Sequence, residues 1–403
     1  MPNFVARQPI FDRHKAIYAY ELLFRSGLDN YFDFSDGDLA TSRVVADSFL
    51  LFGIQELTGK AKAFINFTQN LLTQGLAMSL PREYTVVEIL EQVEPANAVL
   101  HACRRLKQTG YLLALDDFVY HPRFEPLLEL ADIIKVDFRL SGERERSELA
   151  EAFLPRAKTL LAEKVETEAE YQEARELGYS LFQGYFFARP TLVSSQDVPP
   201  SKLQQMRLLA EINTPEMDYG RLAEVIGGEA STAYKLLNYI NSAAMGLRHE
   251  ITSLKQAITL LGESEIRKWA SLLTLASLAT DRPAELTRAA AIRAKMAELV
   301  AMQCGLADRR EDAFLLGLFS LLDTMMGRPL PELLERVPMS GEVRSALVAG
   351  EGPLSHLLAL VLAQERGDWE ELFQRAAHLE LNVETLPEAF FKAVDFTELA
   401  LAI

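Results

Sequence analysis

The amino-acid sequence predicts an α/β domain followed by an all-α domain. In the first half, apolar segments of strand length alternate with amphipathic segments of helical length, and this alternation indicates a parallel (β/α) barrel. From Lys202 onward, the apolar residues follow a helical period and no strand series is found. A polar segment at 191–201, with two adjacent prolines, separates the halves. We therefore expect domains at 1–195 and 196–403.

The elements of the expected barrel follow from two patterns. Strands are short, rich in apolar or β-branched residues and bounded by polar ones, whereas helices carry apolar residues three and four positions apart. The expected strands are 4–10, 16–24, 62–67, 84–90, 111–115, 133–137, 159–165 and 180–188, and the expected helices are 41–57, 95–109, 122–130, 142–154 and 167–177. A polar turn at 12–15 joins the first two strands.

Helix breakers divide the second half into a series of helices. Gly227-Gly228 and Gly262 interrupt the apolar periodicity. The expected helices are 202–212, 218–226, 231–241, 253–261, 263–279 and 287–303, followed by 313–326, 331–337 and 341–349. Their apolar faces are expected to pack together in an all-α domain.

Composition excludes several classes of protein. The 403 residues are 49% hydrophobic and 24% charged, and the formal net charge of -16 argues against a protein that binds duplex nucleic acid. Cys103 and Cys304 form no CxxC or Cys/His cluster, which fits a reducing compartment and excludes a cysteine-rich zinc site. The N-terminus lacks a signal-peptide pattern, and the richest apolar stretch, 313–326, is too short to span a bilayer. We expect a cytoplasmic protein without a membrane segment.

Acidic residues stand at or near the tips of the expected strands. The pair Asp116-Asp117 follows the strand at 111–115, and taken alone it is typical of a turn or a helix cap. The pattern recurs, however, and the further polar residues at strand tips are Glu21, Asn66, Glu88, Glu163 and Glu166. Because the carboxyl ends of barrel strands converge at one mouth, these carboxylates would repel one another unless hard divalent cations neutralised them. Oxygen ligands favour Mg²⁺ or Mn²⁺ over zinc.

Eight short motifs of the first half, taken in order, resemble those of the EAL-domain phosphodiesterases of bacterial cyclic di-GMP signalling. The similar segments are 8–10 (QPI), 21–25 (ELLFR, for EALxR), 66 (the Asn of VNxS), 88–91 (EILE, for ExxE), 116–118 (DDF, for DDFG), 135–137 (KVD, for KxD), 163–167 (EKVET, for EGVET) and 183–190 (QGYFFARP, for QGYxxxxP). One such motif is a weak signal, whereas eight in order are specific.

The resemblance implies a TIM-like barrel that uses two Mg²⁺ or Mn²⁺ ions to hydrolyse one phosphodiester bond of cyclic di-GMP, giving linear pGpG. It implies that one ion is held by Glu21, Asn66, Glu88 and Asp116 and the second by Asp116, Asp117 and Glu163. It also implies that Lys135 orients the attacking water, with support from Glu166 and Gln183. The residues implied to contact the nucleotide are Gln8, Leu23 and Arg25.

Two segments depart from the family pattern. Val119 replaces the Gly that follows Asp-Asp-Phe, and Pro122 fixes a further dihedral, so we expect a loop of different shape. Lys164 replaces the Gly of EGVET and adds a cation between two site acids. Intact ligands with an altered supporting loop leave two functions open, namely an active phosphodiesterase or an inactive receptor or adaptor that acts through protein contacts. A purely structural barrel is least favoured, because unpaired acids at strand tips are costly.

The second half resembles the HDOD domain, a relative of the HD-type metal phosphohydrolases. The resemblance is carried by 236–246 (LLNYINSAAMG) and 251–262 (ITSLKQAITLLG). Catalytic HD domains need an adjacent His-Asp pair, and at the corresponding place Asp323 stands without that histidine. We therefore expect a non-catalytic regulatory domain that docks a protein partner, and homodimer formation is left open.

Overall fold

The computed structural model describes most of the chain. The described residues are 3–26, 54–59, 61–187, 200–214, 230–242 and 249–401, together with positions 220, 223, 226 and 245. Most of the expected helices at 218–226 and 41–57, and the expected domain boundary, lie outside these residues. The chain divides into two compact units, one of Met1–Arg189 with Gln364–Asp368 and the other of Pro190–Ala363 with Trp369–Ile403.

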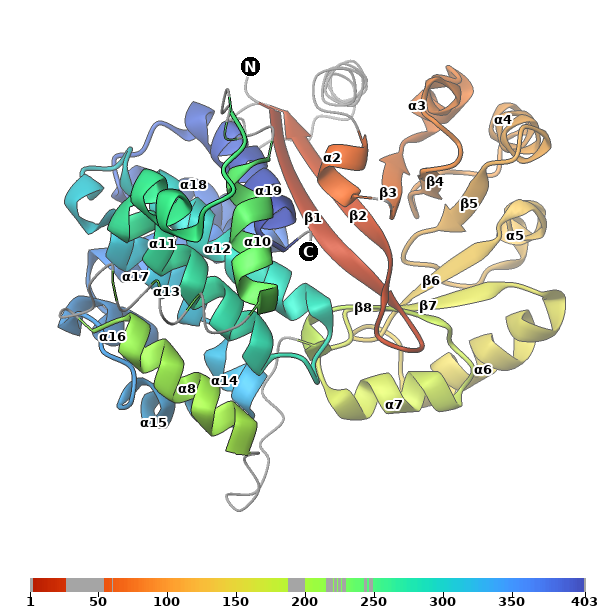
Figure 1. Ribbon diagram of the computed structural model, residues 1–403. Coiled ribbons are helices and arrows are strands. Elements are labelled where there is room, and N and C mark those ends of the chain that lie inside the picture. Colours follow the sequence, from red (N-terminus) through yellow and green to blue (C-terminus); the bar gives the residue numbers. More distant parts are fainter. Residues whose placement is uncertain are drawn as a thin grey trace. The chain divides into compact units, whose positions relative to one another are not determined.

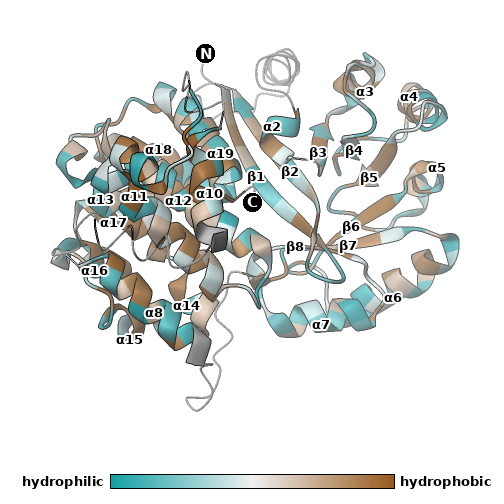
Figure 2. Ribbon diagram, viewed as in Figure 1, coloured by the Kyte–Doolittle hydropathy of each residue, from teal (hydrophilic) through white to brown (hydrophobic). Residues whose placement is uncertain are grey.

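The first unit is a closed barrel of eight strands (Figure 1), as the sequence predicts. Its strands are β1 (Asn3–Asp12), β2 (Ile17–Ser26), β3 (Lys62–Phe67), β4 (Thr85–Ile89), β5 (Leu112–Leu115), β6 (Ile133–Asp137), β7 (Thr159–Glu163) and β8 (Leu181–Gln183). Its described α-helices are α2 (Ile54–Thr58), α3 (Gln69–Thr73), α4 (Asn97–Gln108), α5 (Glu125–Leu130), α6 (Glu143–Phe153) and α7 (Glu168–Glu176). In Figure 2 strand β5 is hydrophobic and α7, on the outside of the barrel, is largely hydrophilic.

The expectation that all strands run parallel is wrong for the first strand. Strands β2 to β8 pair in parallel along the chain, but β1 is antiparallel to both of its neighbours, β2 and β8. The cause is the connection between β1 and β2, which spans only 13–16. A turn of that length can join antiparallel strands, whereas a parallel pair needs a crossover of a dozen or more residues.

The barrel interior is filled by a ring of apolar side chains to which every strand contributes one residue. The ring consists of Ile10, Ala19, Phe64, Val86, Ala114, Ile133, Leu161 and Leu181. All eight are buried, so the interior is a packed core and not a pore. The residues at the carboxyl ends of the parallel strands lie directly above this apolar ring.

The second unit is all-helical, which confirms the predicted class. Its described α-helices are α8 (Pro200–Ile212), α10 (Ala230–Ile240), α11 (Leu254–Leu278), α12 (Ala284–Ala301), α13 (Arg310–Phe319), α14 (Leu322–Met326), α15 (Leu330–Leu334), α16 (Gly341–Val348), α17 (Pro353–Arg366), α18 (Trp369–His378) and α19 (Leu386–Leu401). Gly262 has φ 80° and ψ 164° and kinks α11, at the place where the sequence predicts a break between two helices.

The single helix expected at 313–326 is wrong, because the structure holds two helices there, α13 and α14. Between them, the Ser320 hydroxyl donates a hydrogen bond to the Gly317 carbonyl, 2.7 Å away, and accepts one from Arg293. A serine side chain that bonds a carbonyl of the preceding turn competes with the helical backbone pattern. The break thus coincides with a contact from Arg293, a residue distant in sequence.

No single helix among the described residues is long and apolar enough to cross a membrane. Helices α16 and α17, bent by 50° where they meet, reach the required length and composition only as a pair.

Gly317 is expected to be essential to the packing of α13 on α12. A Cβ atom at this position would lie 2.4 Å from the backbone carbon of Arg293, and backbone cannot move aside as a flexible side chain can. We expect Gly317→Ala to destabilise the helical unit by about 1–3 kcal/mol through overpacking. The matched control is Gly341→Ala, since nothing lies within 4 Å of a Cβ there. Urea unfolding followed by circular dichroism measures both, and equal midpoints for the two variants would contradict this account.

Candidate metal centre

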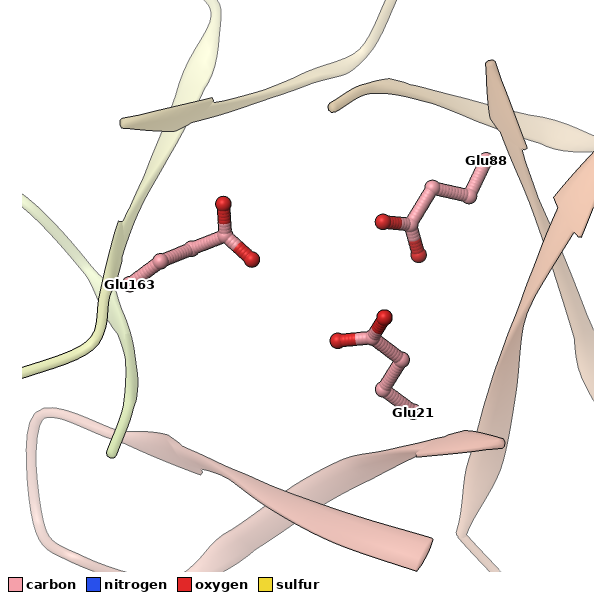
Figure 3. A group of neighbouring side chains, drawn as sticks. All are labelled: Glu21, Glu88 and Glu163. Carbon is pink, nitrogen blue, oxygen red and sulfur yellow. The ribbon is translucent and has the colours of Figure 1, made fainter. Parts of the chain in front are cut away.

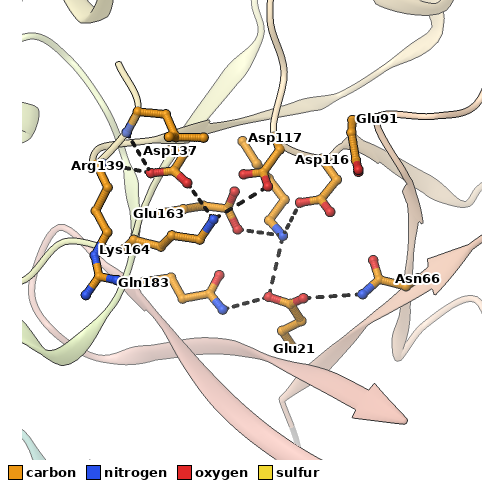
Figure 4. A network of polar contacts seen from close by, with 12 residues as sticks. Glu21, Asn66, Glu91, Asp116, Asp117, Asp137, Arg139, Glu163, Lys164 and Gln183 are labelled. Carbon is orange, nitrogen blue, oxygen red and sulfur yellow. Dashed lines mark hydrogen bonds and ion pairs between the residues drawn. The ribbon is translucent and has the colours of Figure 1, made fainter. Parts of the chain in front are cut away.

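The polar residues of the barrel mouth form a second ring directly above the apolar one. On each parallel strand the polar residue lies two positions after the ring residue, and on the antiparallel β1 it lies two positions before it. The second ring is Gln8, Glu21, Asn66, Glu88, Asp116, Lys135, Glu163 and Gln183. Because side chains alternate between the two faces of a strand, a residue two positions from an inward one also points inward. The alternation therefore brings these eight side chains to one mouth, and Figure 4 shows five of them there: Glu21, Asn66, Asp116, Glu163 and Gln183.

Lys135 lies at the centre of this polar ring. Its Nζ is 2.7 Å from Glu163 Oε1, 2.9 Å from Asp116 Oδ1 and 3.5 Å from Glu21 Oε2. It also forms an ion pair with Glu88 Oε1. Lys135 is 1% exposed and Glu88 is fully buried, so the ammonium and carboxylates meet with almost no solvent between them. Figure 3 shows the carboxylates of Glu21, Glu88 and Glu163 pointing toward one another from three sides of the barrel.

Burial and mutual repulsion shift the protonation of these groups. Burial raises the pKa of Glu163 to about 8, although Lys135 opposes the shift. Burial and the neighbouring Glu21 likewise raise the pKa of Glu88 well above its ordinary value. Burial alone would lower the pKa of Lys135, but the surrounding carboxylates, Glu163 foremost, raise it well above its ordinary value. The ammonium is therefore held in its charged form by an excess of acid.

The residues of the mouth fit hard divalent cations. Two sets of carboxylate oxygens lie within 4.8 Å of one another, Glu21 with Glu88 and Glu163, and Asp116 with Asp117 and Glu163. These are five carboxylates against one Lys135 ammonium at their centre. Within the part of the chain that the structure describes, several buried oxygens here have no hydrogen-bond partner: Asn66 Oδ1, Glu88 Oε2, Asp117 Oδ1, Glu163 Oε2 and Gln183 Oε1. Buried acceptors without donors, all of them oxygens, suit Mg²⁺ or Mn²⁺.

The Asp116-Asp117 pair turns its two carboxylates to different neighbours. Asp116 faces Lys135, whereas Asp117, at a φ of 39°, has its Oδ2 3.5 Å from the ammonium of Lys164. Lys164 also pairs with Asp137, at 2.5 Å. Both residues of the pair belong to the second carboxylate set, so Lys164 stands at the edge of that set.

Glu166 lies just beyond β7 and forms an ion pair with Arg139. Its predicted support of the Lys135 shell stays a prediction. Sequence reasoning did not single out Asp137 or Arg139 as site residues. Asp137 could have been found, because it lies two positions after Lys135 on β6 and shares its face. Arg139 stands in a loop and offers no periodic signal.

The residues predicted to contact the nucleotide lie beside Glu21. Gln8 is paired with Glu21 across the β1–β2 ladder, and Leu23 and Arg25 follow Glu21 at two-residue steps on β2. Gln183 Nε2 donates hydrogen bonds to Glu21 Oε2 at 2.7 Å and to Gln8 Oε1 at 3.1 Å. A row of Glu21, Leu23 and Arg25 on one face of β2 leads from the acids toward the rim of the barrel. Their role in nucleotide binding stays a prediction.

The loop after Asp117 is held by aromatic contacts. Phe118 lies edge-on to Phe124 and Phe153, with ring centroids 6.3 and 5.9 Å apart. Val119 is 70% exposed, so the residue that replaces glycine points to solvent. A cavity of 240 Å³ between this loop and the end of β4 is lined by both aspartates and by Glu91. The loop is thus anchored by aromatic packing, and its expected difference in shape from the family's loop stays a prediction.

Asp323, the residue considered for an HD-type site, lies in the first turn of α14. Its Oδ1 accepts a hydrogen bond of 2.6 Å from the Thr324 backbone amide. Both sets of clustered metal-ligand side chains found among the described residues belong to the barrel and neither includes Asp323. The carboxylate therefore acts as a local helix-start acceptor.

The pKa shifts in the mouth predict a pH-dependent stability of the cation-free protein. Glu163, with a pKa of about 8 against 4.5 ordinarily, binds a proton more firmly in the folded than in the unfolded state. The stabilisation is complete below about pH 4.5 and is lost as the pH rises toward 8. We expect the free energy of unfolding of the barrel to fall across this window in EDTA, and saturating Mg²⁺ to suppress the fall. Glu163→Gln should flatten the profile in EDTA; an unchanged slope would contradict the assignment.

Two known domain families match this chain, one over most of the barrel and the other over much of the helical unit. The model of the EAL domain matches residues 52–190, and that of the HDOD domain matches residues 198–337. The chain is 36% identical over 394 residues to the cyclic di-GMP phosphodiesterase CdgJ of Vibrio cholerae, covering 97% of this chain and 91% of that protein. It is also 36% identical over 406 residues to the uncharacterized protein YuxH of Bacillus subtilis, covering 98% of each.

Among solved structures, an EAL domain protein from Listeria monocytogenes EGD-e is similar to part of the chain, with 22% identity and a TM-score of 0.39. The match covers 47% of this chain and 88% of that one. The two relatives match nearly end to end and include both domains. This chain therefore belongs to the family of proteins in which an EAL domain is followed by an HDOD domain.

Proposed function

We propose that the barrel hydrolyses one phosphodiester bond of cyclic di-GMP to give linear pGpG, with Mg²⁺ or Mn²⁺ as cofactor. The observation that carries this proposal is the ring of buried carboxylates around Lys135, which keeps several oxygens without hydrogen-bond donors. A buried cluster of this kind is costly unless it binds cations. The relative CdgJ, named a cyclic di-GMP phosphodiesterase, supports the same activity.

The cations would be held by the two carboxylate sets, with Asn66 beside the first. Divalent ions in such a pair supply Lewis-acid chemistry, making a water more acidic and neutralising charge on a phosphate. Lys135 Nζ donates hydrogen bonds, so it can orient the oxygen of the attacking water. The oxygen attacks phosphorus, the bond from phosphorus to one ribose oxygen breaks, and that oxygen takes up a proton. Glu163, whose Oε2 has no donor, is proposed to accept the proton of the water in its ionised form.

Gln183 orients Glu21, because its amide donates hydrogen bonds to both Glu21 and Gln8 and so bridges these two side chains. Arg25 is proposed to bind a phosphate of the nucleotide, since the planar guanidinium matches phosphate oxygens in a bidentate manner. Leu23 lies between Glu21 and Arg25 on β2 and is proposed to offer an apolar contact to the nucleotide. These residues bind and position the substrate, whereas the carboxylates and Lys135 carry the reaction.

The helical unit is proposed to regulate the barrel without catalysis of its own. Asp323 bonds a helix-start amide and belongs to neither carboxylate set. Docking of a protein partner and formation of a homodimer are proposals for this unit. Both cysteines are free thiols, which agrees with a reducing compartment, and we propose that the protein works in the cytoplasm.

The activity is tested with purified protein, cyclic di-GMP and either Mg²⁺ or Mn²⁺, following pGpG by chromatography. We expect turnover by the unaltered chain and a loss of at least about 100-fold for Glu21→Gln, which keeps the shape but removes a charged ligand. Nucleotide binding measured by calorimetry is the companion experiment. Binding without turnover under both cations would contradict the enzyme and favour a receptor, and the absence of binding would contradict both.

Asp323→Asn is expected to leave the rate of pGpG formation unaltered within twofold, because its side chain accepts hydrogen bonds from the backbone amide and the hydroxyl of the adjacent Thr324. The same assay measures it, with thermal unfolding to confirm that the variant is folded. A large loss of activity in a folded Asp323→Asn protein would show that the helical unit contributes to catalysis.

A further inference from the structure

Lys164 occupies a backbone position that does not favour a lysine. It directly follows Glu163 at the end of β7 and has a φ of 54°, in the left-handed region that glycine adopts most readily. Its side chain turns back over the mouth of the barrel toward Asp117 and Asp137 (Figure 4). A lysine held in a conformation of this kind puts its ammonium at a defined place.

Asp137 fixes that place. Its Oδ1 accepts hydrogen bonds from the backbone amides of Arg139 at 2.7 Å and Leu140 at 3.1 Å, and its Oδ2 is left to Lys164 at 2.5 Å. Asp137 is only 5% exposed. The ammonium is thus tethered to a carboxylate that cannot easily move, and it extends from there to Asp117.

The two carboxylate sets differ in their relation to this ammonium. Asp117 belongs to the set of Asp116, Asp117 and Glu163, whereas the ion pairs of Lys164 do not include Glu21 or Glu88. Lys135, by contrast, contacts members of both sets, through Asp116 and Glu21. Lys164 therefore forms an ion pair with Asp117, which belongs to one of the two sets only.

We propose that the Lys164 ammonium competes with a divalent cation for Asp117 and so weakens cation binding at the Asp116–Asp117–Glu163 set selectively. This inference rests on the proposed function, because it assumes that both sets bind divalent cations. A like charge next to a cation site opposes binding by direct Coulomb repulsion, and the contact of Lys164 with Asp117 Oδ2 leaves only Oδ1 of that carboxylate to a cation. Lys164 thereby sets the cation concentration at which the second ion binds and the barrel becomes fully loaded.

The test is direct Mn²⁺ binding to the full chain, measured by electron paramagnetic resonance of free Mn²⁺ in the absence of nucleotide. Lys164→Gln removes the charge, shortens the side chain by one atom and keeps the backbone strain of a residue with a Cβ, whereas Lys164→Arg keeps the charge. The matched control is Lys15→Gln. Lys15 also has a positive φ, of 59°, and pairs with a carboxylate, Glu168 at 2.8 Å, outside both sets.

We expect Lys164→Gln to tighten the weaker of two Mn²⁺ sites by about tenfold, a value discounted for the partial exposure of the ammonium. The stronger site should change by less than about twofold, and Lys164→Arg and Lys15→Gln should bind as the unaltered chain does. Equal affinities in Lys164→Gln and the unaltered chain, with two sites in each, would overturn the inference and leave the proposed function intact. An absence of Mn²⁺ binding in every variant would overturn the proposed function itself.

Discussion

The barrel mouth depends on one constraint, namely that the ammonium of Lys135 is surrounded by buried carboxylates. Four of them, Glu21, Glu88, Asp116 and Glu163, pair with it directly. Transferring so many charges from water is costly, and a single positive charge repays only part of that cost. The remaining negative charge makes the mouth a strong attractor for divalent cations. Lys135 thus links stability and function, because the ammonium that offsets the burial of the acids is also proposed to orient the attacking water.

Much of this arrangement could be predicted from the sequence, because it follows from the period of two along each strand. Glu88 and Lys135 each lie within an apolar strand near its carboxyl end, and the convergence of strand ends at a barrel mouth brings them together. The direction of β1 was missed although its short turn signals it. The break at Ser320 and the pairing of Glu166 with Arg139 could not be predicted, since each depends on a partner whose position only the folded chain defines.

Two features lie around the proposed ligand Asp117. The loop after Asp117 is held by aromatic packing, in which the ring of Phe118 contacts that of Phe153. On the opposite side of Asp117, Lys164 adds a tethered positive charge. Both act on the same aspartate and leave Glu21 and Glu88 as they are.

The central claim is that the acids around Lys135 bind divalent cations. The most direct measurement is anomalous diffraction at the manganese absorption edge, from crystals of the full chain grown with Mn²⁺. The account predicts two anomalous peaks, one bounded by the carboxylates of Glu21 and Glu88 and one by those of Asp116 and Asp117. A well-ordered mouth with no peak at either set, and with Lys135 still bound to all four acids, would contradict it.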